Sequence, residues 1–197
     1  MATEVNHDER RRLIVGKAIG LFAKMGYSKV SFLDISEVTG IARTALYRYF
    51  RTKREIFDEA IHETTSGIRR SLEQTCQRDG KAAAKLEACC AIVIDALYGK
   101  KEFFAAIYEF VFAMVRSGED MTDRIDMFTG GLKVVLSRLV AEGVASGELR
   151  DNVDAGDAAE ALYALMESVA LRVMLGVERD SRRAKRRVRT MIAALAK

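Results

Sequence analysis

The chain has 197 residues, 49% of them hydrophobic and 30% charged, and its formal net charge is +4 at pH 7. This length can bury one good core or two small ones. Proline is absent, and no alternating run of apolar and polar residues is long enough for a β-strand, so the composition excludes a sheet-based fold and favours an all-α protein.

The first predicted helix is long and amphipathic, and it ends at Gly26. Its apolar residues recur every three or four positions, which indicates one buried stripe. They are Leu13, Ile14, Ala18, Leu21, Phe22 and Met25. The segment before this stripe, residues 1–12, is polar and unlike a signal peptide, so we expect a cytoplasmic protein.

Residues 31–50 predict two short helices joined by a tight turn. Ser31 and Asp34 form a start that is similar to a capping box. The helix that they open ends at Thr39-Gly40, and glycine can adopt the positive φ that a sharp junction requires. This order is the plan of a helix-turn-helix, whose inner face the long first helix can cover.

The second short helix has one cationic face and one apolar face. At about 100° per residue, one arc contains Arg43, Thr44, Tyr47, Arg48 and Arg51. The opposite side contains Ala42, Ala45, Leu46 and Tyr49. Residues 42–54 include five Lys or Arg and no Asp or Glu. Such a helix suits the major groove of DNA, and the alternative is a solvated basic face.

This segment resembles the amino-terminal signature of TetR-type transcriptional regulators, over roughly residues 10–60. The matching positions are Gly26-Tyr27, Val30-Ser31, Ile35, Gly40-Ile41, the run from Leu46 to Phe50, and Lys53. The chain departs from the family at Ala42, where a Ser or Thr usually caps the recognition helix, and at Ser36 and Thr39, which are usually Ala. Loss of the cap hydroxyl should cost about 1 kcal/mol.

The resemblance implies a role for each matching residue at DNA. Ser31, Tyr47 and Lys53 would hold phosphates, and Tyr49 would lie near the DNA backbone. Base edges would be read from the outward face of the second short helix. The complete predicted set is Ser31, Arg43, Thr44, Ala45, Tyr47, Arg48, Tyr49 and Lys53.

The chain divides by pattern into a helix-turn-helix domain, residues 1–52, and a helical effector-binding and dimerisation domain, residues 53–197, with about nine helices in total. Residues 1–60 carry 11 basic and 8 acidic groups, whereas residues 61–178 carry 13 and 19. A basic head on an acidic body is typical of a DNA-binding module joined to a part with another task.

A linking helix from about Thr52 to Gln77 could transmit a movement between the two domains. The following helices carry aromatic residues that could line an apolar effector pocket or could simply form core. The candidates are Phe103, Phe104, Tyr108, Phe112 and Phe128. Glu102, Glu109 and Arg116 recur every seven residues, which predicts a solvent-facing polar stripe with Glu109 in it.

The last two predicted helices, residues 157–177 and 182–196, suggest a homodimer. The first of them is apolar nearly all round and needs cover on both sides, and the family resemblance implies a four-helix interface. The predicted interface residues are Leu162, Leu165, Met166, Val169, Val173, Met191, Ile192 and Leu195. The stretch from Ala161 to Val177 contains Glu167 and Arg172 and is too short to cross a membrane.

These patterns predict a homodimeric transcriptional repressor that binds a palindromic double-stranded DNA operator and is released by a small, largely apolar effector. We expect no enzyme activity, cofactor or metal, because His62-Glu63 begins a zinc-protease motif that Ser66 breaks. The alternatives are a helical enzyme and a non-specific nucleic-acid-binding protein that uses the basic run 182–189. Neighbouring Cys89 and Cys90 could sense oxidants, but they point about 100° apart on a helix, so the pattern favours buried, inert thiols.

Overall fold

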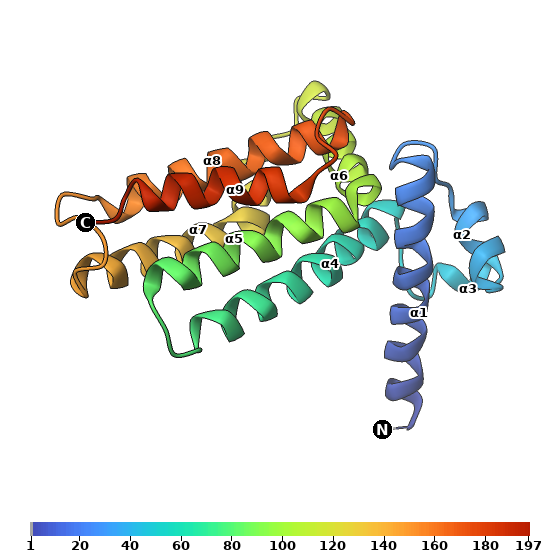
Figure 1. The fold of residues 1–197 in the computed structure, drawn as a ribbon. Helices are drawn as coiled ribbons and strands as arrows, with labels where there is room; N and C mark the ends of the chain where they lie inside the picture. Colours follow the sequence, from blue (N-terminus) through green and yellow to red (C-terminus); the bar gives the residue numbers. More distant parts are fainter. Residues whose placement is uncertain (1) are drawn as a thin grey trace. The chain divides into compact units, whose positions relative to one another are not determined.

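The computed structural model describes the backbone of residues 2–197 and the side chains of residues 7–125, 129 and 131–197. Within residues 2–197, nine α-helices and one isolated β-bridge between Leu149 and Ala196 make up the regular structure (Figure 1). The all-α prediction is confirmed. The helices form two compact units, one of the chain up to Thr65 with residues 102–121, the other of residues 66–101 and 122–197.

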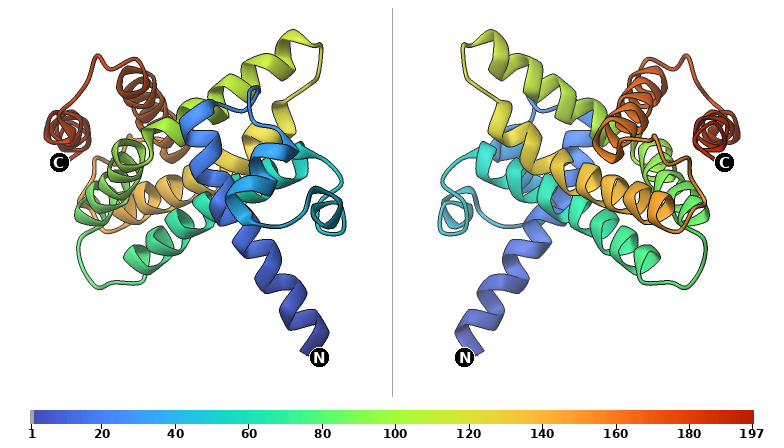
Figure 2. Two further views of the ribbon diagram at one scale, coloured as in Figure 1. Left: turned by 90° about the vertical axis from the view of Figure 1, so that its right-hand side faces the viewer. Right: turned by 90° about the vertical axis from the view of Figure 1, so that its left-hand side faces the viewer.

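The first unit contains more than the helix-turn-helix. It comprises α1 (Ala2–Met25), α2 (Phe32–Thr39), α3 (Arg43–Leu46), the first half of α4 (Lys53–Cys76) and nearly all of α6 (Lys101–Arg116). Two stretches of chain far apart in sequence therefore share one core (Figures 1 and 2).

The core of this first unit is aromatic. The ring of Phe57 lies 4.6 Å from Phe22 of α1, 5.9 Å from Phe103 and 5.3 Å from Phe110, both on α6. The α1 stripe is centred on Ile14, Val15, Ala18 and Phe22, which are all buried. Leu13 is 44% exposed, contrary to prediction, because it lies on the opposite side of the helix from the middle of that stripe.

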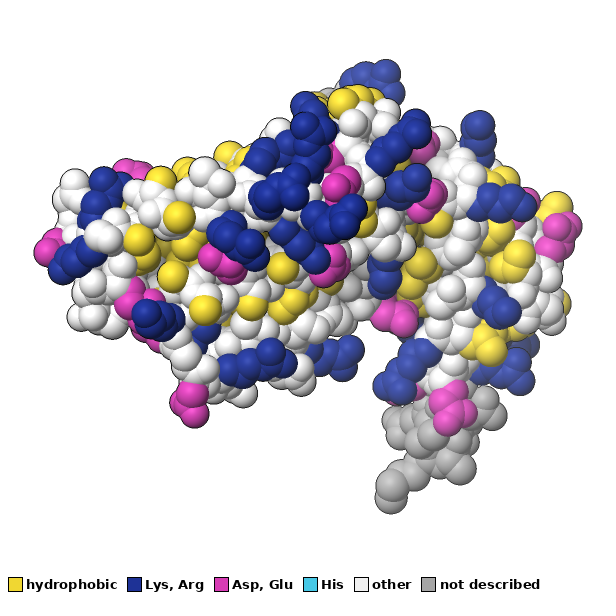
Figure 3. Space-filling model, viewed as in Figure 1, with side chains coloured by type: hydrophobic (Ala, Val, Ile, Leu, Met, Phe, Trp, Pro, Cys, Tyr) yellow, Lys and Arg dark blue, Asp and Glu magenta, His cyan; other side chains and the backbone are white. Residues whose placement is uncertain are grey.

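The second unit is a bundle of the last part of α4 with α5 (Ala82–Gly99), α7 (Thr122–Ala145), α8 (Ala155–Met174) and α9 (Ser181–Ala193). The helix α5 contacts α7, α8 and α9, and the helices run side by side (Figures 1 and 2). Lys and Arg side chains gather over α9 on the face drawn in Figure 3. None of the described helices has the length and apolarity that a membrane span requires.

Candidate nucleic-acid interface

Both ends of α2 have the geometry that the sequence predicts. At its start, the amide of Asp34 donates to Ser31 Oγ at 3.3 Å, and the Asp34 carboxylate accepts from the amide of Ser31 at 2.7 Å. These contacts complete a capping box, and the hydrogen bonds from Ser31 hold the pKa of Asp34 below its ordinary value. At its end, Gly40 has φ of 68°, so the chain turns through a left-handed residue.

Two hydroxyl groups fix the turn between α2 and α3. Ser36 Oγ donates to the carbonyl of Ile41 at 2.8 Å, and the amide of Ile41 donates to Thr39 Oγ1 at 3.3 Å. Ala42, the residue before α3, provides no side-chain cap, because an alanine side chain has no oxygen to accept a hydrogen bond. Ser36 and Thr39, two positions where the chain departs from the family pattern, thus hold the backbone one residue before the missing cap.

The α3 segment presents its cationic side to solvent. The helix itself is short, Arg43–Leu46, and a turn continues through Phe50, whose amide donates to the carbonyl of Leu46. Leu46 is buried and Ala45 and Tyr49 are half-buried, whereas the exposed residues are Arg43, Thr44, Tyr47, Arg48 and Arg51. Ala42 is exposed rather than inward, because it precedes the first helical residue and does not follow the helical period.

Three arginines of this surface have no acidic partner within the described part of the chain: Arg43, Arg48 and Arg51. Their neighbour Arg54 differs, because its guanidinium pairs with Glu119 at 2.8 Å and its hydrogen bond to that carboxylate raises the pKa of Arg54. A guanidinium without an internal partner is available to phosphates and base edges. We call Arg43, Arg48 and Arg51 the arginine surface.

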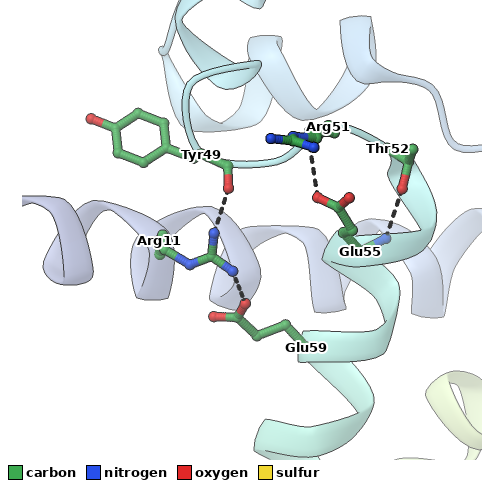
Figure 4. Close-up of polar contacts among 6 residues, drawn as sticks. All are labelled: Arg11, Tyr49, Arg51, Thr52, Glu55 and Glu59. Atoms are coloured by element: carbon green, nitrogen blue, oxygen red, sulfur yellow. Dashed lines mark hydrogen bonds and ion pairs between the residues drawn. The ribbon is translucent and has the colours of Figure 1, made fainter.

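Two tyrosines flank the arginine surface in defined orientations. The ring of Tyr47 stacks on Phe32 of α2 with centroids 4.7 Å apart and an interplanar angle of 10°. The carbonyl of Tyr49 accepts from Arg11 of α1, which also pairs with Glu59 of α4 (Figure 4). Sequence reasoning missed Arg11, because its partners lie 38 and 48 residues away and no local pattern marks them.

The start of α4 completes the frame of the site. The amide of Arg51 donates to Glu55 Oε2 at 2.8 Å, and the amide of Glu55 donates to Thr52 Oγ1 at 3.1 Å (Figure 4). These bonds satisfy backbone donors at the beginning of a helix, where the helix itself provides no acceptor. The chain that carries Arg51 is therefore held against α4.

Lys53 has a structural role inside the unit. Its ammonium donates to the carbonyls of Tyr27 and Ser28 at 2.8 and 3.1 Å and lies 4.5 Å from the centre of the Tyr27 ring. Burial lowers the pKa of Lys53, and the charge of Glu109 partly offsets that effect. Two of its three donor hydrogens are thus occupied, which leaves one for a phosphate.

Glu109 of α6 contacts the same turn between α1 and α2, and the prediction that it faces solvent is wrong. Its carboxylate accepts from the amides of Tyr27 and Ser28, both at 3.1 Å. Burial alone would raise the pKa of Glu109, but the hydrogen bonds from Ser28 and Tyr27 bring it below its ordinary value. Gly26 leaves room for this contact, since a Cβ there would lie 2.2 Å from Glu109 Oε2.

The predicted effector residues do not gather around a described cavity. Phe103 is buried in the aromatic core, Phe104 and Tyr108 are half-buried, and Phe112 is 58% exposed. Phe128 lies outside the residues whose side chains the structure describes. Two hollows on the second unit contain none of the described candidates. The effector pocket therefore stays a prediction.

Most predicted dimer residues pack inside the protomer. Five are buried in the second unit: Leu162, Met166, Val169, Val173 and Ile192. Leu165, Met191 and Leu195 are half-buried. These side chains form the inner face of α8 and α9, because the bundle covers the most apolar side of each helix. A second copy could reach only the outer face, which moves the predicted interface away from the five buried residues.

Two family models together match most of the chain. Residues 14–60 match bacterial regulatory proteins of the tetR family, and residues 82–197 match the C-terminal part of BetI-type transcriptional repressors. The HTH-type transcriptional regulator TtgR of Pseudomonas putida is 26% identical over 180 residues, which cover 88% of this chain and 84% of that protein.

Two further similarities concern fatty-acid regulators of Bacillus subtilis. The fatty acid metabolism regulator protein of strain 168 is 24% identical over 160 residues, 78% of each chain. The solved structure of a transcriptional regulator FadR from this species in complex with stearoyl-CoA has a TM-score of 0.75 at 20% identity, over 94% of this chain and 99% of that one. The structural match supports the same fold.

Proposed function

Because this chain belongs to the TetR family of bacterial transcriptional regulators, we propose that it is a homodimeric repressor, bound to a palindromic DNA operator and released by a small, largely apolar effector. The observation that carries the proposal is the arginine surface, three guanidinium groups without acidic partners among the described residues, beside a capped and hydrogen-bonded helix-turn-helix. That arrangement suits the major groove, where arginine can donate two hydrogen bonds to guanine.

The environment of each side chain supports separate assignments to DNA bases and to phosphates. Arg43, Thr44 and Arg48 are exposed on α3 and its extension, and we assign them to base edges. Tyr47, oriented by Phe32, is assigned to a phosphate. Ser31 Oγ already donates to Asp34 at 2.6 Å, so a phosphate contact from its hydroxyl would require that bond to break.

The outer face of α8 offers a surface for a second copy. An exposed stripe of small and apolar residues recurs along it every three or four positions: Ala161, Ala164, Ser168, Leu171 and Leu175. Leu171 and Leu175 are 49% and 67% exposed. Small side chains allow two helices to approach closely, and a two-fold axis would present two arginine surfaces to successive major grooves.

We assign the effector to the side of α6 that carries Phe104, Tyr108 and Phe112. The relatives named for fatty-acid metabolism and for stearoyl-CoA support an effector with an extended apolar chain. The same helix carries Glu109, which holds the turn between α1 and α2. A ligand that moves α6 would therefore also move that turn. The ligand would weaken DNA binding only as far as it binds more tightly to the state that does not bind DNA.

The basic run at residues 182–189 gives little support to the alternative of a non-specific nucleic-acid-binding protein. Four of its cations pair with carboxylates of the second unit: Arg182 with Asp180, Lys185 with Asp95, Arg187 with Glu178, and Arg189 with Glu87. Paired cations attract a phosphate backbone less than free ones.

Selection of bound fragments from a random pool of duplexes tests the proposed function. We expect one palindromic motif and, in sedimentation, two protomers on each selected duplex. A protein that stays monomeric and enriches no sequence at low salt would contradict the proposal. The variant Arg54→Ala is a matched control, because Arg54 lies near the arginine surface but pairs with Glu119.

A further inference from the structure

A hollow of about 740 Å³ lies on the second unit, where α8 ends and α9 begins. Five arginines line it: Arg172, Arg179, Arg183, Arg186 and Arg187. Only two carboxylates, Glu178 and Asp180, accompany them, so positive charge is in clear excess. The dense group of Lys and Arg over α9 in Figure 3 belongs to this region. We call this site the arginine hollow.

Glu178 fixes one side of the arginine hollow. Its side chain is only 4% exposed, and Oε2 accepts from Arg172 Nε at 3.2 Å and from Arg187. The hydrogen bond from Arg187 lowers the pKa of Glu178, although burial opposes that effect. The carboxylate is thus ionised, and its Oε2 holds two guanidinium groups in place.

The remaining arginines have no such partner. Within the described part of the chain, Arg179, Arg183 and Arg186 form no ion pair, although Arg179 Nε donates to the carbonyl of Gly176 at 3.4 Å and the charge of Arg186 acts on Asp180. Asp180 is engaged by Arg182 and by its capping bond to α9. Arg187 Nε and the hydroxyl of Tyr98 are buried without a hydrogen-bond partner. The charges of Glu178 and Arg187 both act on Tyr98, although Tyr98 is not among the residues that line the hollow.

Arg172, Arg179, Arg183 and Arg186 are exposed and hydrated, but together they raise the local positive potential and attract anions. Like charges repel, and a buried donor without an acceptor costs free energy. A ligand with several anionic oxygens would offset the repulsion and accept from the lining arginines, because the planar fork of arginine matches phosphate geometry. The exposed Val177 and the hydroxyl of Thr190 add an apolar and a polar contact for the rest of such a ligand.

We propose that the arginine hollow binds a phosphorylated organic anion of nucleotide size. The volume supports this size, since about 740 Å³ falls within the range of small-molecule sites, roughly 300–1,000 Å³. A single inorganic ion would leave most of the hollow to water. The site lies in the second unit, distinct from the arginine surface on α3, and its occupation does not depend on DNA binding.

Titration calorimetry on the full chain tests this site, with inorganic pyrophosphate and adenosine 3′,5′-bisphosphate as probes. We expect both to bind saturably, and the nucleotide to bind more tightly because it fills more of the hollow. The double variant Arg183→Ala, Arg186→Ala should weaken both by about tenfold or more, since it removes two charged donors.

The matched control is the double variant Lys185→Ala, Arg189→Ala, which removes the same charge from the same helix at positions whose partners, Asp95 and Glu87, lie outside the hollow. It should leave both affinities within about twofold of the wild type, because it changes the net charge equally without removing a residue that lines the hollow. Equal losses in the two double variants, or no saturable binding by the wild type, would overturn the site. A change of oligomeric state in Arg183→Ala, Arg186→Ala alone would also overturn it, by assigning the arginines to subunit contact. Failure of operator selection would leave this result untouched.

Discussion

Glu109 and Lys53 bind the backbone of the same two residues, Tyr27 and Ser28, one as acceptor and the other as donor. The carboxylate accepts from the amides of Tyr27 and Ser28, and the ammonium donates to the carbonyls of the same pair. The two amides and two carbonyls of Tyr27 and Ser28 are thereby satisfied by side chains from α6 and α4. The turn leads directly into α2, so its position sets the start of the helix-turn-helix.

The variant Glu109→Ala should destabilise the first unit. It leaves the part-buried amide of Tyr27 and the exposed amide of Ser28 without an acceptor, at a cost of about 1 kcal/mol. Urea unfolding at neutral pH measures the change in free energy of unfolding, with the exposed Glu37→Ala on α2 of the same unit as control. A loss no larger than that of the control would show that water replaces the carboxylate without cost.

The contribution of Glu109 should depend on pH in a defined direction. Its pKa in the folded chain lies below the ordinary value of 4.5, so the ionised carboxylate stabilises the folded state above that value. The difference in unfolding free energy between the wild type and Glu109→Gln should stay constant from neutral pH down to about 4.5, then shrink as the pH falls further. Unfolding curves over this range measure it, and a difference that grows on acidification would contradict the shifted pKa.

At the DNA surface, Arg43→Ala and Lys53→Ala should have different effects. Arg43→Ala should cost about 1–3 kcal/mol of binding and relax the preference at one base position. Lys53→Ala should weaken all sequences alike and lower the unfolding free energy, because Lys53 also anchors the turn. Binding to the selected operator and to single-base variants measures the distinction. Equal losses on every sequence from both changes would defeat it.

The uncapped start of α3 offers a stabilising change. Ala42 has φ of −53° and ψ of 139°, a backbone conformation compatible with an N-cap, but no oxygen to accept from the helix. Ala42→Ser should raise the free energy of unfolding by about 1 kcal/mol. Thermal unfolding measures this gain, and Ala42→Val, which adds bulk without an oxygen, should show none.

Cys89 and Cys90 should be inert in the folded state. Burial raises the pKa of Cys89 to about 12, helped by neighbouring Cys76, and burial raises the pKa of Cys90 to about 12. At pH 7 almost no thiolate exists, so alkylation should be slower than for a free cysteine by roughly a thousandfold. Peptide mapping after a timed alkylation measures the rate, and urea should abolish the protection. Rapid native labelling of Cys89 would revive the oxidant-sensing hypothesis.

Local rules account for what the sequence predicts correctly. The capping box at Ser31, the left-handed Gly40 and the exposed Arg43 and Arg48 depend on residues within a few positions of each other. Helical period and residue type suffice there, and the absence of a cap at Ala42 follows in the same way.

The errors concern contacts between distant segments or the choice between two apolar faces. Glu109 lies 82 residues from Tyr27, and no periodic pattern distinguishes a carboxylate that binds a remote turn from one that faces water. The α8 helix has apolar residues nearly all round, so its sequence does not tell which face the protomer buries. Packing decides that question, and it places Leu162 and Val169 inside.

The composition of the first unit limits how segments can be exchanged between related regulators. Residues 102–121 complete a core that begins at the amino terminus, so a single cut at residue 52 would separate Glu109 and Phe110 from their partners. In a chimera that contains only the amino-terminal segment, the turn at Tyr27 and Ser28 would lack Glu109, and the aromatic core around Phe57 would lack the rings of α6. Exchange of DNA specificity between relatives should succeed when the transferred part includes both the helix-turn-helix and α6.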